Sequence, residues 1–513
     1  MVILFSMFFL CIGRVASVAV IQSEKADNTI SVTLESGRGD FYFSGGEKIT
    51  GSKKIYANVF LPNESSKEIF LKNATDEEKE IGNRAFLNNR PAILKREEKI
   101  CGTGIYNFEI EDRYGYIYSL EHIIGYVNGD NVGVSALEKG YEEVLKSEKN
   151  ITVDFYVDAA GNHLLGADPT INENKSNSKV YLTVDKKIQQ ICVEAAENMK
   201  KGAVVVSEIS SGKIRGILSK PGYNINEIHN YLNTESAPFL NRAVSCFNVG
   251  SVFKPMIACV LCENNKQNFK FNCTGSNQIS GINFHCYKRS GHGEMDLNNA
   301  IALSCNSYFY NAINQLNPKC FLNLSAALMF KQKIKLAPNI YSALGRLPDE
   351  NTLKNPAAAA NFSIGQGEIL LSPIALNNLY SCIAGEGVYY APTLIEKVND
   401  NGKSEKIKPN AKTTAISKAT AAQVKEFLYS AVLYGTGKEA APDNLKVAGK
   451  TGTAQTGKFK GNEEITSSWF CGFFPFDKPE YAVTVFFEEA NSESETTVNV
   501  FKSIADKIYK NCP

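Results

Sequence analysis

Alternating hydrophobic and polar positions divide the chain into a strand-rich first part and a mixed second part. Residues 30–34 (Ile-Ser-Val-Thr-Leu) and 151–157 (Ile-Thr-Val-Asp-Phe-Tyr-Val) alternate apolar and polar side chains, which is typical of half-buried strands. Around residues 76–89 the pattern is that of a helix. Residues 172–178 are polar throughout and predict a linker. We therefore predict that residues 22–171 form a β-rich module with some helix.

The part after this linker, residues 179–513, mixes strands and helices. A helix is predicted near residues 186–199. Two apolar runs, residues 203–207 and 213–218, flank Ser211-Gly212, a turn sequence, and predict a β-hairpin. The combination predicts an α+β, multidomain protein with an antiparallel sheet in its second part.

The first residues of the chain are apolar. Residues 1–12 carry no charge, Arg14 follows, and residues 15–21 are again mostly apolar. A run this short suits a signal-peptide core, but residues 1–21 also reach roughly the 20-residue length of a spanning helix if Arg14 extends to the membrane surface. We predict an uncleaved membrane anchor over residues 1–21, with a cleaved signal peptide and a buried N-terminal element as alternatives.

Composition narrows the function classes. The chain has 513 residues, which favours two or three domains, and a net charge of +1, which gives no general attraction to nucleic acid. None of the 13 cysteines falls in the tight four-ligand spacing of a common zinc motif, so we predict no metal site and no cofactor. Cys273 and Cys286 bracket a short polar stretch, and outside the cytoplasm they could form a disulfide.

The first candidate for chemistry is Ser251-Val-Phe-Lys254. A serine and a lysine three residues apart are weak evidence alone, because Ser176/Lys179 and Ser210/Lys213 have the same spacing. Ser251 differs in context, since it follows a glycine and opens a continuous apolar run that predicts a buried helix. A lysine partly removed from water there has a lowered pKa and can act as a base toward the serine hydroxyl. The alternative is a helix-capping serine beside an extended lysine.

The second candidate is Ser304-Cys-Asn306. Alone, this tripeptide is an ordinary helix end or loop. Its hydroxyl and amide lie two residues apart and can face one point from a tight loop. The hydroxyl could relay a proton from Lys254, and the amide could bind a peptide carbonyl.

The third candidate is Lys450-Thr-Gly-Thr453. Two strand-like runs follow it, residues 468–474 and 481–487, and predict an antiparallel three-strand unit. A lysine and two hydroxyls on a strand can hold a carboxylate, and Gly452 leaves room for a peptide close to the backbone. A phosphate-binding loop is excluded because the glycine spacing before Lys450 is wrong.

The order of these segments (serine-lysine, serine-asparagine, lysine-threonine-glycine) resembles that of penicillin-binding protein transpeptidases. Further segments resemble landmarks of that domain: Asn241-Arg-Ala243, His292-Gly293, Ser363-Ile-Gly-Gln-Gly-Glu368, Ser372-Pro373 and Gly435-Thr-Gly437. Upstream segments resemble the pedestal of the class B, monofunctional branch: Arg38-Gly39-Asp40, Gly125-Tyr-Val127, Leu137-Glu138 and Leu182-Thr-Val-Asp185. No segment resembles a glycosyltransferase domain. The resemblance covers nearly everything after about residue 28.

The resemblance implies a pedestal over residues 22–171 and a transpeptidase domain over residues 179–513, with a sheet flanked by helices and an all-α subdomain. It implies that Ser251 attacks the penultimate D-alanine carbonyl of a peptidoglycan stem peptide while Lys254 accepts the proton. Ser304 would pass a proton to the departing D-alanine, and Asn306 would position the peptide. The terminal carboxylate would be bound by Lys450, Thr451 and Thr453, beside Gly452, and the N–H groups of Ser251 and Thr453 would form the oxyanion hole.

The family also implies where the protein acts and with what. The substrates are peptidoglycan stem peptides, β-lactam antibiotics are trapped at the same serine, a membrane glycosyltransferase is the expected partner, and no nucleic acid is involved. The catalytic domain would lie outside the cytoplasm behind a single N-terminal anchor. Two alternatives stay open: a D,D-carboxypeptidase or β-lactamase-like hydrolase, and a non-catalytic penicillin-binding scaffold or sensor.

Overall fold

The structure, a computed structural model, describes residues 28–147, 150–158, 161–164, 166–408, 410, 412–492 and 496–512. The predicted anchor, residues 1–21, lies outside the described residues. Within the described ranges, no helix combines the length and the apolar character needed to cross a membrane. The chain forms two compact units. Unit 1 contains residues 28–39, Thr50–Gly115 and Leu145–Ser178, and unit 2 contains Asp40–Ile49, Tyr116–Val144 and the chain from Lys179 onward.

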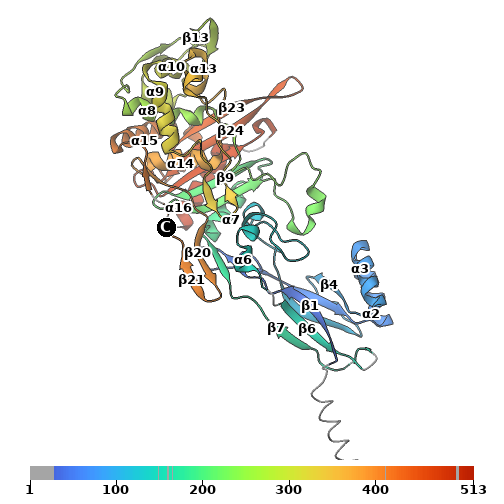
Figure 1. Ribbon diagram of the computed structural model, residues 1–513. Coiled ribbons are helices and arrows are strands. Elements are labelled where there is room, and N and C mark those ends of the chain that lie inside the picture. Colours follow the sequence, from blue (N-terminus) through green and yellow to red (C-terminus); the bar gives the residue numbers. More distant parts are fainter. Residues whose placement is uncertain are drawn as a thin grey trace, which may run out of the picture. The chain divides into compact units, whose positions relative to one another are not determined.

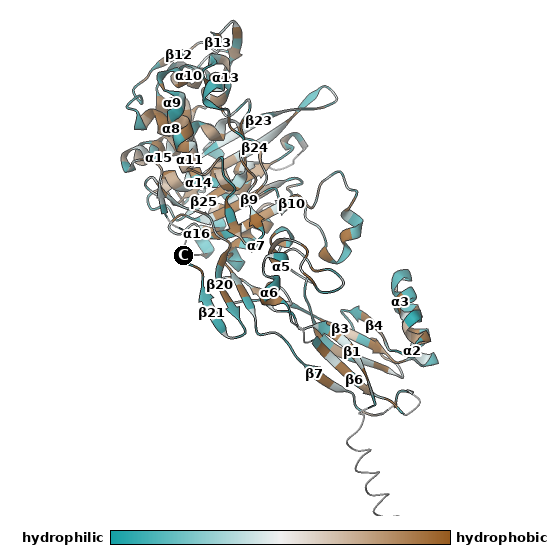
Figure 2. Cartoon of the chain, in the orientation of Figure 1, coloured by the Kyte–Doolittle hydropathy of each residue, from teal (hydrophilic) through white to brown (hydrophobic). Residues whose placement is uncertain are grey.

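Unit 1 is β-rich, as the alternation predicts. It has two three-stranded sheets, β1-β6-β7 and β4-β3-β5. Hydrophobic and hydrophilic residues alternate along β1, β3 and β6 (Figure 2), so that Val32, Leu34, Val153 and Phe155 enter one buried cluster. The second of its two helices begins with a capping box between Thr75 and Glu78. The elements are β1 (Thr29–Ser36), β3 (Lys53–Phe60), α2 (Glu64–Asn73), α3 (Asp76–Leu87), β4 (Ala92–Arg96), β5 (Ile105–Asp112), β6 (Asn150–Tyr156) and β7 (Thr170–Glu173).

The boundary between the units differs from the predicted one. Strand β2 (Asp40–Tyr42) pairs in parallel with β8 (Lys179–Leu182), so two segments within the predicted 22–171 module belong to unit 2. The predicted linker, residues 172–178, begins inside β7, where Asn172 pairs with Thr152. Strand pairing across long sequence separations cannot be read from local polarity, which explains the difference.

The centre of unit 2 is a five-stranded antiparallel sheet in the order β10-β9-β25-β24-β23. The predicted hairpin and three-strand unit are both confirmed. Strand β23 lies at the edge, and with β24 it extends as a long hairpin beyond the other strands (Figure 1). The strands are β9 (Gly202–Glu208), β10 (Ile214–Lys220), β23 (Ala448–Lys460), β24 (Glu463–Phe474) and β25 (Tyr481–Phe487).

Helices cover both faces of this sheet. On one face, α7 (Lys186–Ala195) and α16 (Thr497–Asn511) pack on alternate strand residues such as Val204 and Val483. On the other face lies α14 (Pro373–Ala384), where the Asn377 amide donates to the carbonyl of Ala482 at 3.1 Å. Every residue of α14 is buried. The alternation of the strands therefore supplies two apolar layers, one for each set of helices.

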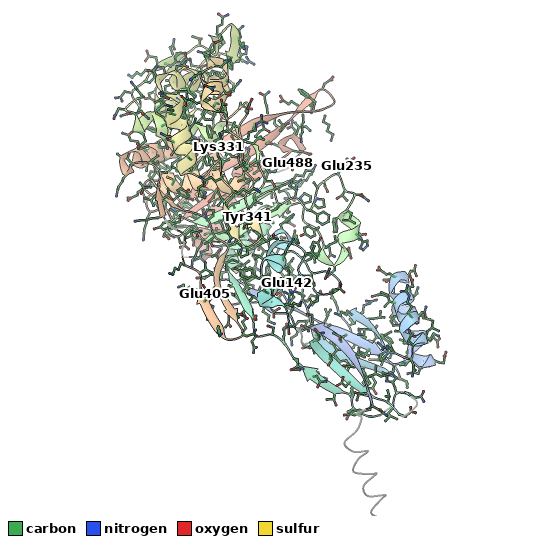
Figure 3. The ribbon with its side chains drawn as sticks, viewed as in Figure 1. Glu142, Glu235, Lys331, Tyr341, Glu405 and Glu488 are labelled. Carbon is green, nitrogen blue, oxygen red and sulfur yellow. The ribbon has the colours of Figure 1, made fainter. Side chains whose placement is uncertain are left out.

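A buried ion pair closes the end of the sheet. Arg242, in the Asn241-Arg-Ala243 segment, is 1% exposed, and its Nε donates at 2.5 Å to Glu488, the glutamate labelled in Figure 3. Its Nη atoms donate to the carbonyls of Ala237 and Ser236. Glu488 directly follows β25, so this landmark segment fixes the chain to the sheet beside the Ser251 region.

The helical part of unit 2 is not all-α, in contrast to the expectation. It also carries two short antiparallel pairs, β12-β15 and β13-β14. Its elements are η2 (Gly250–Phe253), α8 (Lys254–Glu263), β12 (Phe271–Cys273), β13 (Ser276–Ile279), β14 (Ile282–His285), β15 (Gly293–Met295), α9 (Leu297–Ala302), α10 (Asn306–Ala312), η3 (Ile313–Gln315), α11 (Pro318–Ala327), α12 (Glu350–Leu353), α13 (Pro356–Ser363) and α15 (Lys418–Leu433). The remaining elements of unit 2 are α4 (Glu121–Ile124), α5 (Ala136–Gly140), α6 (Glu142–Leu145, shared with unit 1), η1 (Ile225–Tyr231), β11 (Phe247–Asn248), β16 (Lys335–Ala337), β17 (Ile340–Tyr341), β18 (Leu370–Leu371), β19 (Val388–Tyr390), β20 (Ile395–Asp400), β21 (Lys403–Lys406), β22 (Lys412–Thr414), η4 (Lys438–Ala440) and η5 (Ala490–Ser492).

Candidate active site

Ser251 lies in a tight turn that leads directly into a buried helix. The turn is the 3-10 segment η2, and α8 begins at Lys254 with Pro255 in its first turn. Ser251 therefore lies just before the α-helix. The apolar run that it opens had indicated a place in the first turn of that helix instead. A 3-10 turn has three residues per turn, so the side chains at i and i+3 lie one above the other. This geometry places Ser251 and Lys254 on the same side of the turn, while the hydrogen bonds of the Lys254 amine go to Ser304 and Asn306. Apart from Glu263, α8 is buried along its length, as predicted.

Two long-range hydrogen bonds hold this turn in place. The indole Nε1 of Trp469, on β24, donates to the carbonyl of Asn248 at 2.8 Å. The hydroxyl of Tyr380, on α14, donates to the carbonyl of Val252 at 3.0 Å. Both donors are completely buried. The backbone on either side of Ser251 is thus fixed to the sheet and to α14 before any substrate arrives.

Two glycines allow strand β23 to approach the Ser251 turn. Gly250 has φ +62°, and a Cβ atom there would lie 2.4 Å from the carbonyl oxygen of Thr453. A Cβ atom on Gly452 would lie 3.0 Å from the backbone nitrogen of Val252. Any larger residue at either position would force the strand and the turn apart. The lysine-threonine-glycine strand is therefore in direct contact with the serine turn.

Lys254 connects the first two motifs. Its Nζ donates to the Ser304 carbonyl at 2.8 Å, to the Ser304 hydroxyl at 3.1 Å and to Asn306 Oδ1 at 2.7 Å. The lysine is completely buried. Burial lowers its pKa to about 7, opposed in part by the nearby thiols of Cys305 and Cys286. A substantial fraction of this amine is therefore uncharged at neutral pH and able to accept a proton.

Ser304 lies in the short loop between two helices, and Asn306 is the first residue of the second helix. Helix α9 ends at Ala302, and α10 begins at Asn306. Ser304 has φ 53°, in the left-handed region, and is 8% exposed. This conformation is uncommon for a residue with a side chain, and the surrounding contacts must hold it. The Oδ1 of Asn306 accepts from Lys254, and its NH₂ group, which also contacts the Tyr310 hydroxyl, has a second hydrogen with which it can donate to a substrate carbonyl.

Lys450, on β23, is the second completely buried amine of the site. Its Nζ donates to the hydroxyl of Thr436 at 3.1 Å, to the Thr451 carbonyl at 3.1 Å and to the Thr451 hydroxyl at 3.3 Å. The two threonine hydroxyls are 2.8 Å apart. Burial, reinforced by the charge of Lys254, holds the pKa of Lys450 well below its ordinary value. An arriving carboxylate would stabilise the charged form of this lysine, which suits an anion-binding role.

Thr436 was not among the predicted site residues. It lies in Gly435-Thr-Gly437, which the resemblance marked only as a landmark, and its distance from Lys450 in the sequence concealed their contact. The remaining predicted residues differ in exposure. Thr453 is exposed and Ser251 is half-buried. Within the described part of the chain the Ser251 hydroxyl makes no hydrogen bond, so no contact of this group with the protein has to be broken before it reacts.

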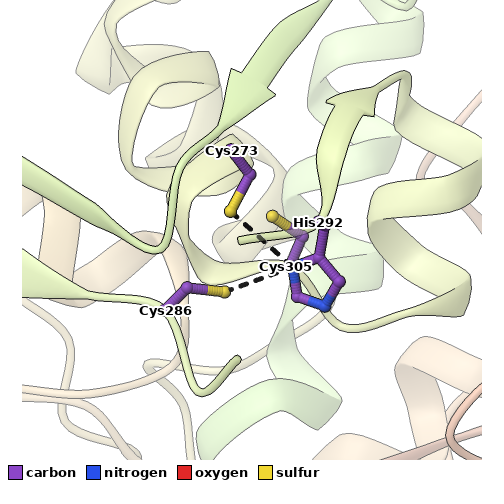
Figure 4. Close-up of side chains that lie close together, drawn as sticks. All are labelled: Cys273, Cys286, His292 and Cys305. Carbon is purple, nitrogen blue, oxygen red and sulfur yellow. Dashed lines mark hydrogen bonds between the residues drawn. The ribbon is translucent and has the colours of Figure 1, made fainter. Parts of the chain in front are cut away.

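The loop that carries Ser304 and Asn306 also contributes to a cluster of possible metal ligands. Cys273, Cys286, His292 and Cys305 place one ligand atom each within 4.8 Å of one another (Figure 4). The sequence predicted no metal site because the four residues are widely spaced, and the fold brings them together. Cys273 and Cys286, considered as a disulfide, are free thiols in the structure.

Comparison with known proteins places this site in a family. Residues 202–510 match the penicillin binding protein transpeptidase domain. The chain belongs to this family. The matched transpeptidase domain contains Ser251, Ser304, Lys450 and their partners described above.

Relatives extend the likeness over much of the chain. Stage V sporulation protein D of Bacillus subtilis is 28% identical over 452 residues, which cover 84% of this chain and 66% of that protein. Peptidoglycan D,D-transpeptidase MrdA of Haemophilus influenzae is 24% identical over 420 residues, covering 74% of this chain and 63% of that protein. The chain thus matches just under two thirds of the length of these relatives. Penicillin binding protein 3 of Mycobacterium tuberculosis, solved in complex with ampicillin, has the same fold, with a TM-score of 0.68 at 19% identity over 94% of this chain and 97% of that one.

Proposed function

We propose that this protein is a peptidoglycan D,D-transpeptidase that cross-links stem peptides through an acyl-enzyme on Ser251. The observation that carries the proposal is the buried amine of Lys254, which is hydrogen-bonded to both Ser304 and Asn306 while its pKa is lowered to about 7. A fully buried lysine without a carboxylate partner among the described residues is costly for stability. Such an arrangement is expected where a base is needed.

Acylation would begin with Lys254 in its neutral form. It accepts the proton of the Ser251 hydroxyl as the serine oxygen attacks the penultimate D-alanine carbonyl. The proton then passes through the Ser304 hydroxyl, 3.1 Å from Nζ, to the nitrogen of the departing D-alanine. The C–N bond breaks, and a Ser251 ester remains. The amine of a second stem peptide attacks this ester, forms the cross-link and returns the proton to Ser251.

The edge strand β23 would bind the donor peptide. Its free edge can pair with an extended peptide, as an added strand pairs with a sheet. Lys450, Thr451 and Thr453 would hold the terminal carboxylate, and Thr436 joins this group through its hydrogen bond to Lys450. The N–H groups of Ser251 and Thr453 would stabilise the tetrahedral oxyanion.

The setting of the enzyme follows from its substrate. Peptidoglycan lies outside the cytoplasm, which supports a single anchor in residues 1–21 with the catalytic domain on the outer side, and unit 1 as a pedestal. A monofunctional enzyme needs glycan strands made by another protein, which supports a membrane glycosyltransferase as its partner. β-Lactams would acylate Ser251, a role supported by the ampicillin complex of the M. tuberculosis protein of the same fold.

The test is the fate of the acyl-enzyme. Intact-mass spectrometry of the protein with a penicillin should show one adduct per chain, and peptide mapping should place it on Ser251. The adduct should persist for many turnover times in water. With a stem-peptide donor, added acceptor amine should give cross-linked product in preference to hydrolysis. Rapid loss of the penicillin adduct would favour a hydrolase, and the absence of any adduct would favour a non-catalytic scaffold.

Acylation should depend on pH through Lys254. Only the neutral amine can accept the Ser251 proton, so the second-order rate constant for acylation should rise about tenfold per pH unit below about 7 and level off above it. The charged and titratable groups near Lys254 are Lys450 on β23 and the thiols of Cys305 and Cys286. Stopped-flow acylation by a chromogenic penicillin between about pH 5 and 9 measures the profile. A rate that stays constant across this range would exclude Lys254 as the base.

A further inference from the structure

A cluster of three sulfur atoms and one imidazole ring lies beside the Ser304 loop. Cys273 ends β12, Cys286 directly follows β14, His292 directly precedes β15, and Cys305 caps α10. The three cysteines are at most 2% exposed, and His292 is half-buried. Backbone bonds hold this framework, because the N–H of His292 donates to the carbonyl of Cys273 at 3.0 Å and the N–H of Cys286 donates to Gly275 at 3.0 Å. Three β-strand ends and one helix start therefore converge on one point (Figure 4).

The distances match a coordination shell. With Zn–S bonds of about 2.3 Å and a Zn–N bond of about 2.0–2.1 Å, tetrahedral geometry puts each sulfur about 3.6 Å from the nitrogen. The Nδ1 of His292 lies 3.7 Å from the sulfur of Cys273 and 3.5 Å from that of Cys286. All four ligand atoms lie within 4.8 Å of one another. Two sulfur–nitrogen distances therefore already have the values of a zinc shell, and the remaining pairs lie close enough for a central ion to draw them together.

Hydrogen bonding selects the tautomer of His292 that can bind a metal. The Tyr287 hydroxyl donates to the carbonyl of Leu303 at 3.0 Å, and a carbonyl can only accept. Tyr287 must then act as acceptor toward the Nε2 of His292, 3.4 Å away. The ring hydrogen is therefore on Nε2, and Nδ1 presents a lone pair to the two sulfurs. One lone pair cannot form two good hydrogen bonds at once, whereas a shared cation would satisfy the nitrogen and every sulfur.

We propose that Cys273, Cys286, His292 and Cys305 bind one zinc ion in a closed, structural Cys₃His site. The ligand set is that of structural zinc: three soft sulfurs and one imidazole, with no position left open for water. The Nε2–H group of His292, on the side of the ring away from the sulfurs, donates to the Tyr287 hydroxyl. Metal-bound histidines are usually oriented by a hydrogen bond of this kind.

The zinc site would position the second motif of the active site. Cys305 lies between Ser304 and Asn306, both of which bind Lys254. The left-handed conformation of Ser304 needs an anchor next to it, and a Cys305–zinc bond supplies one. This consequence rests on the proposed function, whereas zinc binding itself does not.

Metal content of the full chain tests the site. Purified under reducing conditions, the protein should hold about one zinc per chain by elemental analysis and native mass spectrometry. Cobalt should replace it and give the visible absorption of a tetrahedral sulfur-ligated site. Cys286→Ser and His292→Asn should each lose stoichiometric metal. Cys192→Ser, which removes a completely buried thiol outside the cluster, is the matched control and should keep it.

Three outcomes would overturn the site: reduced wild-type protein that takes up neither zinc nor cobalt, cluster variants that keep the metal, or a disulfide between two of the three cysteines that persists in place of a metal in protein purified under reducing conditions. For the positioning role, zinc removal should slow penicillin acylation of Ser251 about ten-fold or more, and reloading with cobalt should restore it. Stoichiometric zinc in a protein that penicillin never labels would refute the proposed function and leave the zinc site standing. Acylation unchanged by zinc removal would refute only the positioning role.

Discussion

Replacing Ser251 by alanine should abolish covalent labelling by penicillin and leave the fold intact. The hydroxyl is the proposed nucleophile, so without it no ester can form. It is half-buried and makes no hydrogen bond within the described residues, so its removal should change the free energy of unfolding by less than about 0.5 kcal/mol. Fluorescent penicillin on a denaturing gel measures labelling, and thermal unfolding measures stability.

The chain supplies its own control for this experiment. Ser210 also precedes a lysine by three residues, but it lies exposed in the β9–β10 turn and its hydroxyl donates to Glu208. Ser210→Ala should label like the wild type. Labelling that survives in Ser251→Ala, or disappears in Ser210→Ala, would contradict the assignment of the nucleophile.

The site was predictable where its geometry is local. Ser251 and Lys254 are three residues apart at the start of an apolar run, and one helical turn is enough to put them together. Lys450 and Thr451 are neighbours on a strand, and the runs after them showed the partner strands. In these places the hydrophobic pattern predicted the secondary structure, and the resemblance to a known family supplied the roles of the residues on it.

The site was not predictable where distant segments meet. Lys254 was expected to act on Ser251 and to exchange a proton with Ser304, but nothing in the local sequence indicated that its amine would also bind Asn306. Thr436 reaches Lys450 because α15 and η4 turn the chain back to β23, a consequence of packing and not of spacing.

The metal ligands show the same limit. Zinc motifs are usually recognised by pairs of ligands a few residues apart, and here each ligand comes from a separate strand end or helix start. The pairing of β12 with β15 and of β13 with β14 creates their proximity. The same holds for the unit boundary, where β2 leaves the predicted module to pair with β8. In this chain the sequence therefore predicts the helices and strands well, but it predicts poorly which distant segments pair or pack with them.

Replacing Lys254 by methionine should separate activity from stability. Loss of the base should slow penicillin acylation by about 10²–10⁴-fold and remove its dependence on pH near 7. Methionine has a similar length and carries no charge, so it should pack in the same buried space. Lys213→Met, the lysine of the control pair at Ser210, should be acylated at the wild-type rate.

The difference in the free energy of unfolding between Lys254→Met and the wild type should depend on pH. A pKa lowered from 10.5 to about 7 corresponds to about 5 kcal/mol of preference for the neutral amine in the folded state. Between pH 7 and pH 10.5 the unfolded chain binds more protons at this lysine than the folded chain does, so the free energy of unfolding of the wild type rises with pH across this range. Below pH 7 the full cost of the buried charged amine is present.

Methionine removes that penalty but leaves the Ser304 and Asn306 acceptors without their donor, at a cost of about 1–3 kcal/mol. The penalty falls from about 5 kcal/mol below pH 7 to about 2 kcal/mol at pH 9, where it is comparable with this cost. We therefore expect Lys254→Met to be more stable than wild type near pH 6 and to lose that advantage near pH 9. Urea unfolding at the two pH values measures the difference. Destabilisation by the same amount at both pH values would show that Lys254 binds the same number of protons in the folded and the unfolded chain, and therefore that burial does not lower its pKa.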